Sequence, residues 1–216
     1  MRMEKVFHNA DGKRVLMRMV KAIQENKEYL GEVDGLIGDG DHGMNMNKGF
    51  SMFQERYKEN DIDFCSGLQA LGLVLLDEIG GSMGPIYGTM FLSMAKAAEG
   101  KDTLTLSDLA GMMTSALCEL QGLVKARAGD KTLMDSLIPA TEAITEAKMQ
   151  GKEVQAALEM MKQAAKSGKD ATKDMTAKYG RSSRLGERSR GVLDAGAVSC
   201  YLLLESMADG IMEAME

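Results

Sequence analysis

The sequence predicts an all-α protein. Apolar residues recur every three or four positions in one segment after another, which is the spacing of an amphipathic helix. No segment shows the apolar–polar alternation that a half-buried strand requires. The chain has 24 glycines and only 2 prolines, and the glycines gather between the periodic segments. These observations predict about eight helices in a single domain, residues 1–216.

The helices can be placed in chain order by their apolar stripes and end signals. Pro85 stands early in its helix, where a missing N–H is tolerated, and Gly100 follows a helix end. Ser107 and Asp108 offer an N-cap to one helix, and Asp194 offers one to the last. The expected helices cover 15–23, 42–57, 68–75, 85–99, 109–120, 132–148, 156–164 and 202–212.

Bulk properties exclude several classes of function. A net charge of −6 does not provide the basic surface that nucleic-acid binding needs, so no nucleic-acid partner is expected. No apolar run approaches the roughly 20 residues that span a bilayer, so no membrane partner is expected either. No signal peptide is visible in residues 1–13. Cys65, Cys118 and Cys200 each lie in an apolar stretch, which predicts buried thiols in a reducing cytoplasm.

The most informative segment is an acidic turn between the first two predicted helices. It holds Asp34, Asp39 and Asp41 among closely spaced glycines. Three carboxylates in so short a turn repel one another without a cation, and Mg²⁺ commonly takes carboxylates together with water and substrate phosphates. The segment therefore fits a Mg²⁺ site that bridges to phosphate. It equally fits a solvated acidic loop in which Asp41 caps a helix.

Three better-known motifs do not account for this part of the sequence. Gly38, Gly40 and Gly43 spell G-x-G-x-x-G, but the dinucleotide fingerprint needs a preceding strand and a βαβ unit. The turn also lacks the ligand spacing and the final Glu of an EF-hand. Residues 129–132 resemble only part of a P-loop.

Two other loops carry signals for an anion. Residues 80–85 form a glycine-rich segment before a helix, where free N–H groups can bind phosphate or simply make a tight turn. Residues 173–190 contain six basic and two acidic side chains, so this segment is positively charged although the whole chain has a net charge of −6. Flexible arginines can hold a phosphorylated ligand, although such a segment can also be a solvated face. An acidic turn, a glycine turn and an arginine-rich lid together describe a nucleotide–Mg²⁺ site.

These motifs, in this order, resemble one family over nearly the whole chain. Ile37-Gly-Asp-Gly-Asp-His-Gly43, Gly80-Gly-Ser-Met-Gly-Pro85 and Gly129-Asp-Lys-Thr132 are followed by 180–189 and by Asp194-Ala-Gly196. The sequence is similar to the nucleotide-binding L subunit of dihydroxyacetone kinase. Met83 and Ala195 depart from the family pattern, in which serine and proline are common.

The resemblance implies a fold and a set of site residues. The fold would be an eight-helix, up-and-down antiparallel barrel with ADP or ATP at one end. Asp34, Asp39 and Asp41 would bind two Mg²⁺ ions. The nucleotide would be contacted by His42, Gly43, Met44, Asn45, Gly81, Ser82, Met83, Thr132, Leu133, Arg181, Asp194, Ala195 and Gly196. No catalytic residue is assigned, since such catalysis is mostly positioning and charge neutralisation.

The resemblance also implies a division of labour in a phosphotransferase. A separate K subunit would hold the ketose, and this chain would present the phosphoryl group. The donor would be free ATP or a phosphoprotein of the sugar phosphotransferase system that recharges bound ADP. Erythrulose is an alternative ketose, and a homodimer is left open. A nucleotide-sensing regulatory module and a standalone phosphohydrolase are the competing functions.

Overall fold

Residues 6–215, the part of the chain described by the computed structural model, are mostly helical. The predicted all-α class is confirmed. The α-helices are α1 (Gly12–Glu25), α2 (Lys27–Gly35), α3 (His42–Tyr57), α4 (Phe64–Glu78), α5 (Met83–Ala97), α6 (Leu106–Leu123), α7 (Met134–Met149), α8 (Val154–Ala171) and α9 (Ala195–Ala214). Two short 3₁₀ segments, η1 (Asn9–Asp11) and η2 (Thr172–Asp174), adjoin α1 and α8, and a longer one, η3 (Arg181–Ser189), lies within the connection between α8 and α9.

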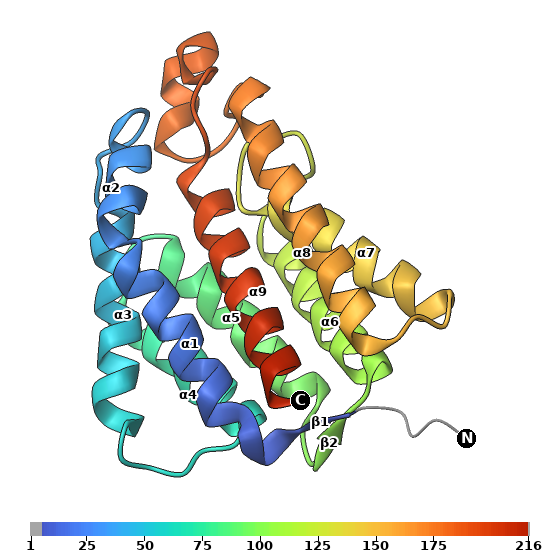
Figure 1. Ribbon diagram of the computed structural model, residues 1–216. Helices are drawn as coiled ribbons and strands as arrows, with labels where there is room; N and C mark the ends of the chain where they lie inside the picture. Colours follow the sequence, from blue (N-terminus) through green and yellow to red (C-terminus); the bar gives the residue numbers. More distant parts are fainter. Residues whose placement is uncertain (1–5, 216) are drawn as a thin grey trace.

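The helices form a closed ring of antiparallel neighbours (Figure 1). Each helix from α3 to α9 packs against the next along the chain, and α9 packs against α1 to close the ring. Helix α2 lies beyond the end of α1 and packs on α3, so α1 and α2 together occupy one position in the ring. An up-and-down ring brings alternate connections to the same end. The connections 36–41, 79–82, 124–133 and 172–194 therefore share one end of the barrel (Figure 1).

Helix α2 was missed by the sequence prediction, which left 27–35 without an element. The chain breaks at Asn26, whose φ of −104° and ψ of 8° depart from the helix. Its side-chain amide donates to the Ala22 carbonyl at 2.8 Å and so satisfies the end of α1. Helix α2 buries only Leu30 and Val33, which is too short an apolar pattern to detect.

Three further details differ from the sequence prediction. The strands β1 (Phe7–His8) and β2 (Thr103–Leu104) pair antiparallel at the end opposite the four connections, where no strand was expected. The N-cap of α6 is Thr105 rather than Ser107 or Asp108, and Asp108 completes a capping box as the third helical residue. Cys118 is exposed on α6, whereas Cys65 and Cys200 are buried free thiols as expected.

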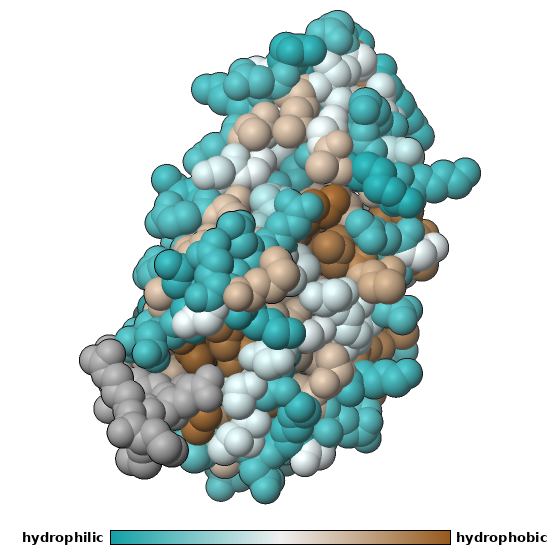
Figure 2. Space-filling model, turned by 90° about the vertical axis from the view of Figure 1, so that its right-hand side faces the viewer, coloured by the Kyte–Doolittle hydropathy of each residue, from teal (hydrophilic) through white to brown (hydrophobic). Residues whose placement is uncertain are grey.

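The core runs along the inside of the ring. Buried side chains from all the α-helices, α1 to α9, form one apolar cluster, in which Phe7 meets Phe64 edge to face and Phe50 meets Phe91 in the same way. The face seen in Figure 2 is mostly hydrophilic, with apolar residues in small areas. Within residues 6–215, no helix is both long and apolar enough to cross a membrane.

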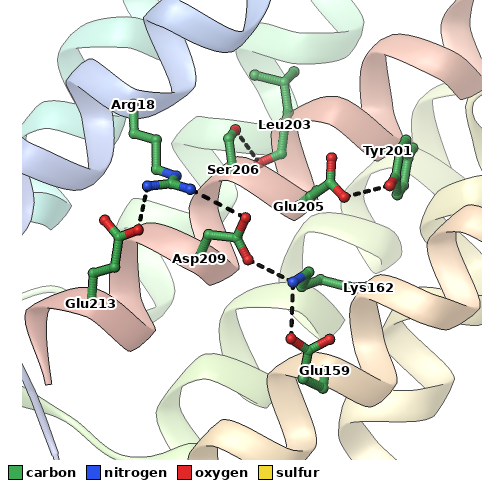
Figure 3. A network of polar contacts seen from close by, with 9 residues as sticks. All are labelled: Arg18, Glu159, Lys162, Tyr201, Leu203, Glu205, Ser206, Asp209 and Glu213. Carbon is green, nitrogen blue, oxygen red and sulfur yellow. Dashed lines mark hydrogen bonds and ion pairs between the residues drawn. The ribbon is translucent and has the colours of Figure 1, made fainter. Parts of the chain in front are cut away.

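Polar contacts join α9 to its two neighbours, α1 and α8, where the ring closes (Figure 3). Asp209 on α9 accepts a hydrogen bond from Lys162 Nζ on α8 at 2.6 Å, and it faces the Arg18 guanidinium of α1 at 3.4 Å. The Lys162 side chain is only 14% exposed and the Asp209 side chain 25%. One carboxylate thus connects the last helix to both of its neighbours.

We expect Asp209→Ala to lower the free energy of unfolding by about 1–3 kcal/mol, because a largely buried ammonium loses its main partner. Glu159→Ala is the matched control. Glu159 also contacts Lys162, but its side chain is 52% exposed, and the expected loss is below about 0.5 kcal/mol. Urea unfolding measures both values, with an unchanged denaturant slope. Equal losses for the two variants would contradict the role given to Asp209.

Candidate functional site

The four connections at one end of the barrel enclose a cavity of about 360 Å³. Its walls come from the acidic turn, the start of α5, the segment after α6, the residues around Gly180 and the start of α9. Residues that are far apart in the sequence meet here because the ring places every second connection at this end.

The acidic turn brings its three carboxylates together. Carboxylate oxygens of Asp34, Asp39 and Asp41 all lie within 4.8 Å of one another. Two glycines make this approach feasible. A Cβ on Gly38 would lie 2.4 Å from Asp34 Oδ1, and Gly40 has a φ of +77°, which disfavours other residues.

Asp41 occupies the N-cap position of α3, but its side chain makes no capping hydrogen bond. The capping alternative raised by the sequence is therefore not what the structure contains. Partial burial, followed by the charge of Asp39, raises the pKa of Asp41 above its usual value. An oxygen-only donor set with mutual repulsion fits a hard divalent cation such as Mg²⁺.

A single arginine of the basic segment reaches the acidic turn. Arg181 forms an ion pair with Asp39 and lines the cavity. Arg190 instead contacts Glu187, Thr176 and the Asp174 carbonyl, all within the segment itself. Gly180, Gly186 and Gly191 have positive φ angles, which let the chain turn sharply. Residues 175–193 project as a separate segment at this end of the barrel (Figure 1), and this segment is called the lid below.

Lys131 anchors both ends of the lid. Its side chain is completely buried, and its ammonium donates to the carbonyl oxygens of Thr172 and Val192. Burial lowers the pKa of this lysine. Beside it, Gly191 N–H donates to the Lys173 carbonyl at 2.7 Å, so the two lid ends are also joined directly.

Asp135 shapes the segment that precedes α7. Its carboxylate accepts hydrogen bonds from Gly129 N at 2.5 Å and from Thr132 N at 2.7 Å. Because Asp135 is buried at the start of α7, this contact holds Thr132 and Leu133 at the cavity wall.

Helix α5 starts at the cavity. Ser82 and Met83 line it, and the Ser82 side chain makes no capping hydrogen bond. Gly81, with a φ of +72°, turns the chain into the helix. The free N–H groups of a helix start attract an anion.

Asp194 caps α9, as the sequence predicted. Its carboxylate accepts from Ala197 N at 2.7 Å. Burial raises the pKa of Asp194 to about 7, although the Ala197 N–H and nearby Lys131 both favour the charged form. Ala195 and Gly196, which follow it, also line the cavity.

His42, at the start of α3, lies at the cavity floor. Its Nε2 lies 2.8 Å from Ser199 Oγ, and the Tyr87 hydroxyl lies 2.6 Å from the same oxygen. Burial lowers the pKa of His42 to about 4. The ring is therefore neutral at physiological pH.

The structure brings most of the sequence-predicted site residues to this cavity. Those that line it are Asp34, Asp39, Asp41, His42, Ser82, Met83, Thr132, Leu133, Arg181, Asp194, Ala195 and Gly196. Four others do not line it. Gly81 adjoins it, Gly43 is packed against α2, and Met44 and Asn45 continue along α3, where Met44 is 62% exposed.

The sequence prediction missed several residues of the cavity. Tyr87 lies within an apolar helical pattern and gave no signal of its own. The same holds for Ser199, which does not line the cavity but contacts Tyr87 and His42. Lys131 belongs to residues 129–132, which the sequence analysis noted as a motif. The sequence alone does not show that this lysine is buried. Tyr179 adjoins Gly180 in the basic segment and could have been included. The remaining missed lining residues include Ile86, Val124, Lys125 and Ala126.

Comparisons with known proteins match this chain to characterised relatives. The family model described as the DAK2 domain matches residues 36–209. The chain is 37% identical over 196 residues to the PEP-dependent dihydroxyacetone kinase, ADP-binding subunit DhaL, of Escherichia coli K12, covering 89% of this chain and 92% of that protein. It is 35% identical to the PTS-dependent dihydroxyacetone kinase, ADP-binding subunit DhaL, of Lactococcus lactis, and the match covers 87% of this chain and 90% of that protein.

A solved structure shares the fold. The crystal structure of the dihydroxyacetone kinase from C. freundii in complex with AMP-PNP and Mg²⁺ matches with a TM-score of 0.67 and 20% identity, over 95% of this chain and 35% of that one. The chain thus spans about a third of the length of the solved kinase it matches.

We expect Gly43→Ala to destabilise the protein by about 1–3 kcal/mol, as overpacking does. The new Cβ would lie 1.8 Å from the Lys27 carbonyl oxygen, so α2 and α3 must separate and Asp34 must move away from Asp41. Gly111→Ala, on an open helix face with no atom within 4 Å, should gain about 0.5–1 kcal/mol. Thermal or urea unfolding measures both. Unchanged stability of Gly43→Ala would mean that this glycine serves a ligand and not the packing.

We expect Asp194→Asn to change the pH dependence of stability. The unfolded chain releases this proton near pH 3.8, and the folded protein holds it up to about pH 7, so the wild type loses stability as pH rises through that window. Asparagine keeps an oxygen acceptor for the cap and carries no charge. The variant should therefore gain stability relative to the wild type across the window, by up to about 1.4 kcal/mol per pH unit. Urea unfolding without nucleotide tests this, and a pH-independent difference would refute it.

Proposed function

The chain belongs to the DAK2-domain family of DhaL-type ADP-binding subunits, and on that premise we propose that it is the nucleotide-binding subunit of a dihydroxyacetone kinase. It binds ADP or ATP with Mg²⁺ and transfers a phosphoryl group to a short ketose. The observation that carries the proposal is the group of three aspartates within 4.8 Å, placed in one cavity with Arg181 and the start of α5.

The chain's own residues fit these roles. Asp34, Asp39 and Asp41 supply carboxylate oxygens for two Mg²⁺ ions, in keeping with their spacing and mutual repulsion. Bound Mg²⁺ neutralises the charge of the phosphates. The helix start at Ser82 and Met83 offers backbone N–H groups to the same phosphates.

The rest of the cavity suits the nucleotide and controls access to it. Val124, Ala126 and Leu133 make an apolar wall for the base. Arg181 reaches the acidic turn from the lid and adds a positive charge near the phosphates. Lys131 holds both ends of the lid and so fixes its base beside the cavity.

The names of the matched relatives support a choice of acceptor and donor. Those relatives are named as subunits of a dihydroxyacetone kinase, so a separate K subunit holds the ketose, and dihydroxyacetone is preferred to erythrulose. Their PEP- and PTS-dependence favours a phosphoprotein that recharges bound ADP over exchange with free ATP. The homodimer and the cytoplasmic location stay predictions.

The experiment begins with the purified protein. Denaturing it releases bound small molecules, which mass spectrometry identifies, and ADP or ATP is the expected finding. A K subunit with dihydroxyacetone is then supplied either with ATP or with a phosphorylated donor protein. Phosphorylation of the ketose with the donor protein and a catalytic amount of ADP assigns the donor. Absence of bound nucleotide, together with no Mg²⁺-dependent nucleotide binding, would refute the proposal.

We expect Asp39→Asn to weaken Mg²⁺-dependent ADP binding by at least about 100-fold, because a ligand loses its charge. Asp61→Asn is the matched control, since it makes the same change on an exposed loop at the opposite end of the barrel. Isothermal titration calorimetry with and without Mg²⁺ measures both, and circular dichroism should show unchanged helix content. Wild-type affinity in Asp39→Asn would refute the metal assignment.

A further inference from the structure

The segment 129–132 connects the wall of the cavity to the lid. On the side of the wall, Gly129 and Thr132 donate their backbone N–H groups to the Asp135 carboxylate at 2.5 and 2.7 Å. Thr132 lines the cavity and is followed by Leu133, which lines it as well. A shift of the segment therefore changes the part of the wall that Thr132 and Leu133 form.

The same segment holds the lid at three points. The Lys131 ammonium donates to the carbonyl oxygens of Thr172 and Val192, where the chain enters and leaves the lid. The neighbouring Asp130 accepts twice from Lys178: its carboxylate accepts from the ammonium at 2.6 Å, and its carbonyl accepts from the backbone N–H at 3.1 Å. Two consecutive residues thus fix both ends of the lid and a point between them.

The backbone of Lys131 is strained. Its φ of +61° lies in the left-handed region, and no other described residue except glycine has a positive φ. This conformation costs a residue with a Cβ about 1–2 kcal/mol. Lys131 is also completely buried, and a buried ammonium is unfavourable unless acceptors surround it. Such a conformation persists only where the surrounding contacts determine it, and the two carbonyl oxygens are the contacts that the ammonium makes.

The lid carries Arg181 to the acidic turn. Its η3 segment begins at Arg181, which pairs with Asp39, and ends at Ser189. The Ser189 hydroxyl accepts from the Ala177 N–H at 2.9 Å, so the lid is closed on itself close to its base. Because the base is held by the segment 129–132, the position of Arg181 depends on that segment.

We propose that Lys131 is a positioning residue that couples the cavity wall to the lid. A ligand that contacts the wall at Thr132 and Leu133 restrains the segment 129–132. Through Lys131 this restraint reaches the lid, which brings Arg181 to the phosphates of the ligand. The coupling acts in both directions, because an ordered lid favours the ligand by as much as the ligand favours the ordered lid. That the ligand is a nucleotide rests on the proposed function.

A double-mutant cycle between Lys131 and Arg181 tests the coupling, with Mg²⁺–ADP affinity measured by isothermal titration calorimetry. In the wild-type background, Arg181→Ala should weaken binding by about 10-fold, the effect of one lost hydrogen bond to a charged group. In Lys131→Gly, where the lid no longer holds Arg181 in place, the same substitution should change the affinity by less than about 2-fold. If Lys131 served stability alone, the effect of Arg181→Ala would stay at about 10-fold, and that result would overturn the proposal. An affinity that Arg181→Ala changes in neither background would overturn it as well.

Two substitutions of Lys131 separate the loss of the ammonium from a change in the backbone. Glycine adopts a φ of +61° without strain, so Lys131→Gly should keep the fold. Lys131→Met also lacks the ammonium but keeps most of the side-chain bulk, and it should abolish the coupling equally. Loss of coupling in Lys131→Gly alone would assign the effect to backbone flexibility and contradict the role of the ammonium. Lys169→Met is the matched control, since this side chain is 13% exposed and contacts Asp170 and the Tyr201 ring outside the lid. It should leave the effect of Arg181→Ala unchanged.

Hydrogen–deuterium exchange distinguishes this proposal from the proposed function. In the free protein, residues 175–193 should exchange faster in both Lys131 variants than in the wild type or in Lys169→Met. Unchanged exchange of the lid would overturn the positioning, whether or not a nucleotide binds. With Mg²⁺ and ADP, the wild type should gain protection in 124–133 and 175–193 together, and the Lys131 variants only in 124–133. A wild-type protein that binds no nucleotide would refute the function, while faster lid exchange in the free variants would still support the positioning.

Discussion

Repulsion among three carboxylates is the constraint on which the functional end of this molecule depends. Asp34, Asp39 and Asp41 are held within 4.8 Å by a turn that only glycine at 38 and 40 permits. Such a turn costs free energy unless a cation offsets the charge. Arg181 offsets part of it by pairing with Asp39, and the proposed divalent ion would offset the rest. Binding of that ion would then couple the acidic turn to the lid, because both cations act on the same carboxylates.

The topology of the barrel explains how segments that are distant in the sequence bring these charged groups together. In an up-and-down ring every second connection reaches the same end, so the acidic turn, the start of α5, the segment before α7 and the lid all lie at that end (Figure 1). Buried polar residues then fix each connection. Asp135 holds the segment before α7, Lys131 holds the lid, and Asp209 closes the ring near the far end. The same polar residues that stabilise the connections and the ring therefore also fix the geometry of the site.

Sequence reasoning succeeded where one residue type dictates local chemistry. The aspartates of the acidic turn, the cap at Asp194 and the long amphipathic helices all follow from patterns within a few residues. It failed where the outcome depends on distant packing. Helix α2 is too short to show a stripe, Cys118 lies in an apolar stretch but on the outer face of α6, and Gly43 serves the contact with α2. The contact between Tyr87 and Ser199, and that between Lys131 and Thr172, join residues more than 40 positions apart in the chain.

The proposed function requires that Mg²⁺ and a nucleotide bind at one end of the barrel, between its four connections. Hydrogen–deuterium exchange of the whole protein, with and without Mg²⁺ and ADP, tests it most directly. Slower exchange is expected in residues 36–41, 79–83, 124–133 and 175–193, with no change in the opposite connections at 58–63, 98–105 and 150–153. Protection confined to the opposite end, or protection by ADP that is the same without Mg²⁺, would contradict it.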